Sequence, residues 1–169
     1  MIVADTERLV LRRLTVADAE FILELLNDPG FLRFVGDKGV RTFDDAREYI
    51  LKGPIDSYER FGFGMYLVEL RQDGTPIGIC GLVKREFLQD VDVGFAFLPQ
   101  FHAKGYAVEA ASAVVAYAKR ALGLLRIAGI TRPDNHGSIR VLEKLGLKFE
   151  RMVELGENGP IDKLFVRDL

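Results

Sequence analysis

Residues 100–111 read Gln-Phe-His-Ala-Lys-Gly-Tyr-Ala-Val-Glu-Ala-Ala, and this stretch decides the fold of the chain. An apolar run ends just before it, and small apolar residues recur at helical spacing after it, which predicts a strand, a tight loop and a long helix. A loop with Gly105 at a helix N-terminus leaves backbone N–H groups unpaired and uncovered. These groups favour a phosphate or pyrophosphate, although an ordinary strand-loop-helix turn has the same pattern.

The composition limits the classes of protein that need to be considered. The 169 residues are 49% hydrophobic and 28% charged, which indicates one globular domain over residues 1–169. No apolar run is long enough to cross a bilayer, and no signal-peptide pattern is visible at the N-terminus. Cys80 is the single cysteine, which excludes an internal disulfide and favours a cytoplasmic location.

The charged and metal-ligating residues exclude two kinds of partner. The net charge of −2 does not indicate a nucleic-acid-binding face. Two histidines and one cysteine, none at ligand spacing, argue against a structural metal site. His102 and His136 are expected to be solvated, and Cys80 is expected to lie in the core.

Helix signals occur in both halves of the chain. Thr15 and Thr42 are expected to be N-caps, each with an aspartate three residues further on. The first helix is expected to end at residues 27–29, with a loop over 31–41, and Gly53 is expected to end the second. The long helix follows Gly105, and a last helix carries Ile139, Leu142 and Leu145 on its core face.

Alternating and apolar runs predict seven strands, at 8–12, 65–70, 76–83, 91–98, 126–131, 148–154 and 161–169. The strand, crossover helix and strand over residues 91–131 predict a parallel pair with a right-handed crossover, while hairpins predict antiparallel pairing elsewhere. Gly78 and Gly81 suggest a bulge or close packing, and Gly94 is a place where the ladder could bulge and bend. Phe149 and Val153 are expected to face inward. A mixed sheet covered by helices, of the α/β (α+β) class, satisfies these patterns.

Two motifs in this order resemble those of the GNAT-superfamily N-acetyltransferases. Residues 102–107, His-Ala-Lys-Gly-Tyr-Ala, are similar to the family's Gln/Arg-x-x-Gly-x-Gly/Ala loop. Residues 135–146 carry Asn135, Ser138, Lys144 and Gly146 at the spacing of its Asn-x-x-Ser-x-x-x-x-x-Lys-x-Gly helix. The surroundings of the loop, and the opening Glu-Arg-Leu-Val-Leu-Arg of residues 7–12, resemble the RimJ/RimL branch. Each motif has a predicted strand and helix around it, and the resemblance covers almost the whole chain.

The resemblance implies a fold and a cosubstrate. The fold would be a mixed, mostly antiparallel sheet flanked by helices, with splayed central strands. The cosubstrate would be acetyl-CoA, without a metal. Its pyrophosphate would lie on the loop of His102, Ala103, Lys104, Gly105, Tyr106 and Ala107. The backbones of Phe97 and Leu98 would bind the pantetheine arm, and Asn135 and Ser138 would approach the thioester.

Three positions depart from the family pattern. His102 replaces glutamine or arginine, and Ala103 replaces a glycine, which narrows the approach of the pyrophosphate without removing an N–H group. Leu142 occupies the position of a tyrosine that often serves as general acid, and it cannot donate a proton. The cofactor site is therefore better supported than any one scheme of proton transfer.

Two residues are candidates for the proton transfer and hydrogen bonding that acetyl transfer requires. An amine attacks a thioester only when it is neutral, so a proton acceptor is needed, and the thiolate that leaves needs a hydrogen-bond donor. Asp92 is the candidate base. The alternative is that Asp92 is only an exposed carboxylate on a strand. Ser138 is the candidate donor, the alternative being support of the helix start near Asn135. Glu109, in the first turn of the long helix, is interpreted as structural.

The predicted function is N-acetylation of a primary amine, either a protein N-terminal amino group or a small-molecule amine. Asp37, Arg41, Phe31, Phe34 and Tyr58 lie in segments expected to face this acceptor. The alternative is a non-catalytic acyl-CoA-binding or sensing module, which the missing tyrosine permits. A Rossmann nucleotide-binding fold is less favoured, because Gly-x-Gly-x-x-Gly is absent. A monomer and a homodimer both remain open, with no nucleic-acid or membrane partner expected.

Overall fold

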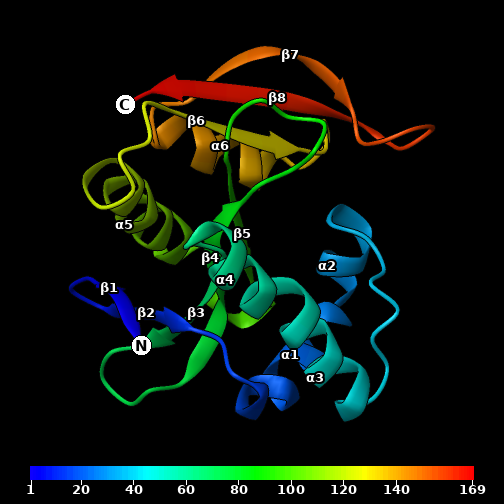
Figure 1. Ribbon diagram of the computed structural model, residues 1–169, viewed down its shortest axis with the longest axis vertical. Coiled ribbons are helices and arrows are strands. Elements are labelled where there is room, and N and C mark those ends of the chain that lie inside the picture. The colour runs from blue at the N-terminus through cyan, green and yellow to red at the C-terminus, as the bar shows by residue number, and fades with distance from the viewer.

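All eight strands of the chain join one twisted sheet. The computed structural model describes residues 1–169 (Figure 1). The strands are β1 (Ile2–Asp5), β2 (Leu9–Arg13), β3 (Met65–Leu70), β4 (Pro76–Val83), β5 (Asp92–Phe97), β6 (Arg126–Thr131), β7 (Lys148–Glu154) and β8 (Ile161–Asp168). They lie in the order β1-β2-β3-β4-β5-β6-β8-β7, and every neighbouring pair is antiparallel except β5 and β6. The predicted mixed, mostly antiparallel sheet is confirmed.

Helices cover the sheet on both faces. They are α1 (Ala19–Leu26), α2 (Pro29–Phe34), α3 (Phe43–Ile50), α4 (Asp56–Phe61), α5 (Tyr106–Arg120) and α6 (His136–Lys144). Thr15 and Thr42 form the predicted capping boxes, with Asp18 and Asp45 as reciprocal partners. No helix is both long enough and apolar enough to cross a membrane.

Three elements lie where the sequence predicted none. The edge strand β1 has only four residues, too few for an alternating pattern to be distinguished. Helix α2 occupies part of the expected loop, because Asp28 caps it and Pro29 stands at its first position. Gly53 does not end the second helix: a π-helical segment (Leu51–Ile55) carries the chain into α4.

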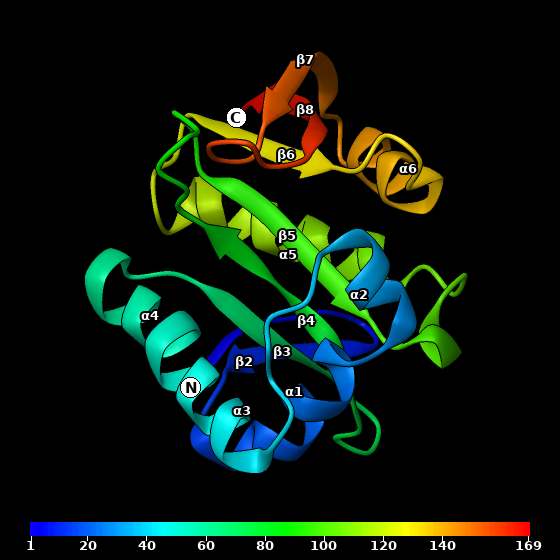
Figure 2. The same ribbon diagram turned by 90° about the vertical axis from the view of Figure 1, so that its right-hand side faces the viewer.

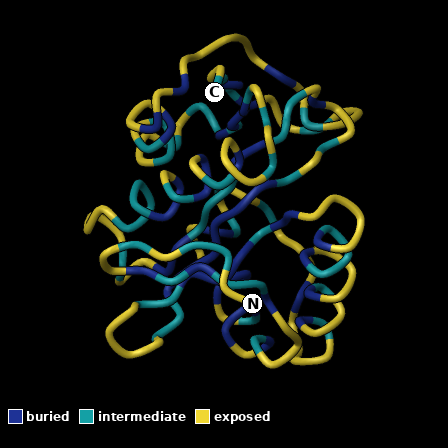
Figure 3. The backbone as a smooth tube through the Cα atoms, turned by 60° about the vertical axis from the view of Figure 1, so that its left-hand side comes forward, coloured by how far each residue is buried: buried dark blue, intermediate teal, exposed yellow.

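The sheet separates two apolar cores. On β3 the side chains alternate, with Tyr66 and Val68 packed on the α5 face and Leu67 packed on the face of α1 and α3. The buried residues follow these central strands, whereas the outer turns of the helices are exposed (Figure 3). Phe149 on β7 is 53% exposed, so its predicted inward orientation is wrong, whereas Val153 is buried as expected. A register shift between Phe149 and Arg151 interrupts the alternation on that strand.

The central strands β5 and β6 separate along their length. They share one pairing, between Asp92 and Ala128, where the Ala128 N–H donates to the Val91 carbonyl at 2.8 Å. Beyond it the two strands diverge (Figure 2). Gly94 does not form the bulge that the sequence allowed, because the β4–β5 ladder passes through Gly94 without a register shift. The splay therefore lies wholly on the β6 side of β5.

The glycines of β4 permit close packing of neighbouring chain. A Cβ atom added at Gly81 would overlap the Gly64 carbonyl oxygen, and one added at Gly78 would overlap the Ala96 carbonyl oxygen. Gly81 ends the β3–β4 ladder opposite Met65, and the β4–β5 ladder passes through Gly81 without a register shift, so close packing explains this residue.

Candidate active site

The loop before α5 presents a run of free backbone donors. None of the six N–H groups of residues 103–108 donates a hydrogen bond within the chain. An ordinary helix leaves about four such groups. The two extra donors come from the loop, where Ala103 has φ +59° and Gly105 has φ +81°. Left-handed residues in a loop before a helix turn backbone N–H groups toward one side, which creates a concave site for an anion.

These donors border a cavity of about 440 Å³. The cavity lies between the end of β5, the α5 loop and the start of α6, with α2 across it. Eight of the ten predicted cofactor residues line it: Phe97, His102, Ala103, Gly105, Tyr106, Ala107, Asn135 and Ser138. Lys104 and Leu98 do not line it. The structure therefore brings together most of the predicted cofactor residues, although they come from three separate elements.

The exposed edge of β5 has fewer free groups than the sequence predicted. The Leu98 N–H donates to the Ile77 carbonyl at 3.0 Å, and the Leu98 carbonyl accepts from Phe101 at 3.0 Å. The Phe97 carbonyl lies 2.8 Å from Nε2 of His102. Backbone groups alternate in direction along an antiparallel strand. The N–H and C=O groups of Phe95 and Phe97 therefore point toward the gap between β5 and β6, and those of Leu98 point toward β4.

Arg8 supports the loop in a way that the sequence did not reveal. Its guanidinium donates to the Lys104 carbonyl at 3.0 Å, pairs with Glu109 at 2.7 Å and lies over the Tyr106 ring at 4.4 Å. Thr6 and the Arg8 backbone also bond Glu109. These bonds lower the pKa of Glu109, against the opposing effect of its partial burial. Glu109 thus joins the β1–β2 hairpin to α5, consistent with its structural interpretation. Arg8 and Glu109 lie about a hundred positions apart in the sequence, so no local spacing pattern predicts their contact.

The start of α6 separates the roles of Asn135 and Ser138. The Asn135 side-chain oxygen accepts from the Ser138 backbone N–H at 3.2 Å and caps the helix. The Ser138 hydroxyl has no hydrogen-bond partner in the chain, so it does not support the helix start. Leu142 is 1% exposed, and its side chain packs close to Gly129 on β6. Residue 142 is therefore a core position here, and it lines neither large cavity.

A second cavity of about 810 Å³ adjoins the first one along β5. It is bounded by α2, α4, β5, the end of β6 and the 155–162 segment. Seven residues line both cavities: Phe31, Phe34, Val35, Phe95, Ala96, Asn135 and Ser138. The two cavities thus meet at the middle of β5 and the first turn of α6. A ligand held at the α5 loop and another held in the larger cavity would meet at this junction.

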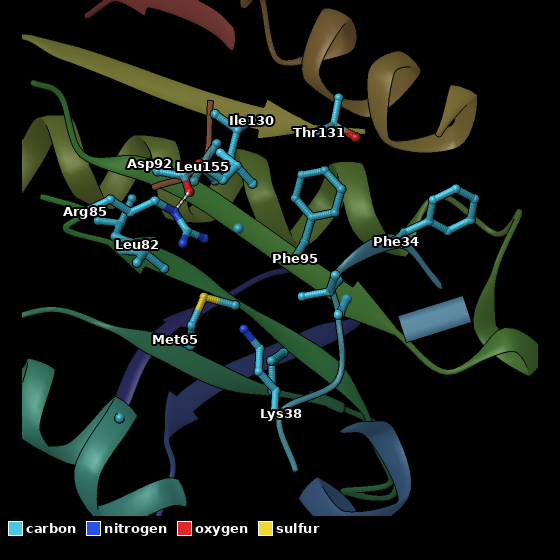
Figure 4. Close-up of a pocket in the computed structure, with 18 of the residues that line it drawn as sticks. Phe34, Lys38, Met65, Leu82, Arg85, Asp92, Phe95, Ile130, Thr131 and Leu155 are labelled. Carbon is cyan, nitrogen blue, oxygen red and sulfur yellow. Dashed lines mark hydrogen bonds and ion pairs between the residues drawn. The ribbon is translucent and has the colours of Figure 1, made fainter. Parts of the chain in front are cut away.

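Asp92 lies in the wall of the larger cavity, and its predicted exposed alternative is wrong. It is 1% exposed, and its Oδ2 accepts from Nε of Arg85 at 2.7 Å (Figure 4). Its Oδ1 has no hydrogen-bond partner. Burial raises the pKa of Asp92 to about 6, against the opposing effect of Arg85. A buried carboxylate with a free oxygen and a pKa near neutrality is suited to accept a proton.

The larger cavity also contains residues that the sequence did not single out. Asp162 on β8 is buried, and its Oδ1 faces Nε of Arg132 across 3.5 Å without a hydrogen bond. Burial raises the pKa of Asp162 as well. Of the residues expected to face the acceptor, Phe31 and Phe34 line the cavity. Asp37 and Arg41 instead pair with each other.

Tyr58, also expected to face the acceptor, is a buried structural residue. Its hydroxyl accepts from the Leu14 N–H at 3.0 Å and donates to the Met65 carbonyl. Its ring stacks on Tyr66 with centroids 5.6 Å apart.

Comparison with known proteins agrees with the motifs. Residues 8–148 match the acetyltransferase (GNAT) domain family. The chain is 31% identical over 145 residues to YnaD, an N-acetyltransferase of Bacillus subtilis strain 168, covering 86% of this chain and 82% of YnaD. A GNAT-family acetyltransferase structure from Bacillus anthracis is 26% identical with a TM-score of 0.81, covering 99% of this chain and 98% of that one.

A RimL ribosomal L7/L12 alpha-N-protein acetyltransferase, solved in complex with coenzyme A, shares the fold. Its TM-score is 0.86 at 18% identity, covering 100% of this chain and 98% of that chain. The family match, the sequence relatives and the splayed sheet agree with one another. The chain therefore belongs to the GNAT family of N-acetyltransferases.

Proposed function

We propose that this N-acetyltransferase takes its acetyl group from acetyl-CoA, bound at the α5 loop, and transfers it to a primary amine bound in the larger cavity. The observation that carries the proposal is the run of six unpaired N–H groups at residues 103–108, beside a cavity that meets a second one. Backbone donors at a helix N-terminus suit a pyrophosphate. The coenzyme A complex of the RimL structure supports the same choice of cosubstrate.

The chain's own residues fit this cosubstrate. The N–H groups of residues 103–108 would hold the pyrophosphate, with Lys104 close to it. The backbone of Phe95 and Phe97 would bind the pantetheine arm along the edge that β6 leaves free. Leu98 would not contact it directly, because its backbone groups are already paired and its side chain packs in the core. Asn135 and Ser138 would lie beside the thioester, at the junction of the cavities.

Proton transfer would use Asp92 and Ser138. The amine attacks in its neutral form, and the unpartnered Oδ1 of Asp92 accepts the amine proton, directly or through water. The Ser138 hydroxyl, which has no partner in the chain, donates a hydrogen bond to the departing thiolate. A thiolate is only modestly basic, so a hydroxyl suffices where many relatives have a phenol. Backbone N–H groups of β5 would stabilise the oxyanion.

Substitution of Gly105 tests the anion site. Gly105→Asp is expected to weaken acetyl-CoA binding at least tenfold relative to Gly105→Asn, because only the aspartate places a negative charge among the N–H groups. Both side chains tolerate the positive φ and have nearly the same shape. Calorimetric titration of each variant measures the difference. In the wild type, acetyl-CoA at about 100 times its Kd should raise the free energy of unfolding by about 2.7 kcal/mol. Equal affinities of the two variants would count against the site.

The pH dependence of the rate tests Asp92. Since Asp92 must be ionised to accept a proton, kcat/KM should fall as the pH drops through its pKa of about 6. Asp92→Asn should lower kcat/KM by about 10²- to 10⁴-fold and remove this acidic limb. Asp162→Asn is the matched control, because it neutralises the other buried carboxylate of the cavity and should retain the limb. If Asp92→Asn keeps both the rate and the limb, the proton goes to water or to another group.

Removal of the Ser138 hydroxyl tests the hydrogen bond to the thiolate. Ser138→Ala should slow single-turnover acetyl transfer about ten- to a hundredfold, with little change in acetyl-CoA affinity. The helix cap survives, because it uses the Ser138 backbone N–H. Leu142→Tyr should not rescue the variant, since residue 142 packs in the core. Ser112→Ala, at an exposed serine of α5, is the control. An unchanged transfer rate in Ser138→Ala would remove Ser138 from the mechanism.

A further inference from the structure

The basic side chains of the larger cavity are not equally free to bind a ligand. Six of them line it, and five have partners within the chain. Arg33 pairs with Asp134 at 3.3 Å, Arg60 with Asp56 at 3.3 Å and Arg132 with Asp162 at 3.5 Å, while Nζ of Lys84 donates to the carbonyls of Leu88 and Gln89 at 3.3 and 3.4 Å. Arg85 pairs with Asp92 through Nε at 2.7 Å, which leaves its two terminal nitrogens free, and Lys38 has no partner.

Lys38 and Arg85 point into the cavity from opposite walls. Lys38 belongs to the segment between α2 and α3, and its ammonium group extends toward the side of the cavity that holds the Arg85 guanidinium (Figure 4). Although much of the Lys38 side chain is exposed, desolvation and the nearby Arg85 charge lower its pKa. Lys38 has no hydrogen-bond or ion-pair partner. Arg85 uses only Nε, toward Asp92, and its two terminal nitrogens donate to nothing in the chain.

We propose that Lys38 and Arg85 bind a carboxylate of the acceptor, so that the substrate is a small amino acid-like amine rather than a peptide N-terminus. This inference rests on the proposed function. The two terminal nitrogens of an arginine match a carboxylate in a bidentate geometry, and the lysine adds a compact positive charge. The Asp92 carboxylate offsets the charge of Arg85, and Lys38 is the charge that remains for the ligand.

The position of Arg85 favours a short distance between the amine and the carboxylate of the substrate. Arg85 bonds directly to Asp92, the proposed proton acceptor, so the anion site and the amine site are neighbours. An α-amino acid carries both groups on one carbon, whereas a peptide N-terminus has a neutral amide in place of the carboxylate. Phe31, Phe34 and Phe95 line the same cavity and give it apolar surface, which suits an aromatic side chain.

Phenylalanine and phenylalaninamide form a matched pair of probes that differ in the charge of one group. The free carboxylate raises the pKa of the neighbouring amine, so the amide has more of its amine in the reactive neutral form. Any preference for the acid must therefore come from the protein. With acetyl-CoA as donor, kcat/KM for phenylalanine is expected to exceed that for phenylalaninamide at least tenfold, measured by mass spectrometry of the acetylated products.

Variants of Lys38 test whether this residue causes the preference for phenylalanine over phenylalaninamide. Lys38→Gln should reduce the acid-to-amide ratio about tenfold, chiefly through KM, and Lys38→Arg should restore most of it. Arg33→Gln is the control, because Arg33 lines the same cavity but is already paired with Asp134. An amide acetylated as well as the acid, or a ratio unaffected by Lys38→Gln, would overturn the inference and favour a peptide N-terminus. Acetylation of neither compound by a protein that binds acetyl-CoA would also overturn it. A failure to bind acetyl-CoA would instead refute the proposed function on which it rests.

Discussion

The separation of β5 from β6 is the constraint on which the rest of the structure depends. The strands share a single pairing at Asp92 and Ala128 and then diverge, so the β6 side of β5 lacks a neighbouring strand. Unpaired backbone groups are costly to bury, so such an edge persists only where water or a ligand reaches it. The same separation opens the space into which the N-terminus of α5 points. One feature of strand pairing therefore creates both an edge for an extended ligand and an approach to an anion site.

Rigid elements then place the chemical groups around this opening. Asp92 lies at the start of β5, where β5 and β6 are still paired. Ser138 lies in the first turn of α6, beside the part of β5 that is separated from β6. The Arg8–Glu109 contacts fix the α5 loop against the β1–β2 hairpin. Because these groups belong to strands and helices rather than to long loops, their relative positions are set by the packing of both cores. The geometry of this opening and the stability of the fold thus depend on the same contacts.

The local parts of this arrangement could be predicted from the sequence, because local spacing determines them. The strand-loop-helix around Gly105, the caps at Thr15 and Thr42, and the crossover from β5 to β6 all follow from neighbouring residues. The burial of Asp92 could not be predicted, since it depends on Arg85 and on strands that are distant in sequence. The Arg8–Glu109 pair and the Lys38–Arg85 pair are similarly non-local. No bulge forms at Gly94, because a glycine in a strand allows a bulge without requiring one.

Hydrogen exchange at the α5 loop is the most direct test of the central claim, that the unpaired N–H groups of residues 103–108 hold the pyrophosphate of acetyl-CoA. These amides lack partners in the chain, so they should exchange rapidly in the free protein. Saturating acetyl-CoA should slow exchange at these six positions, while amides of α3, on the other face of the sheet, should change little. Unchanged exchange at residues 103–108, in a protein shown by calorimetry to be saturated with acetyl-CoA, would contradict the account.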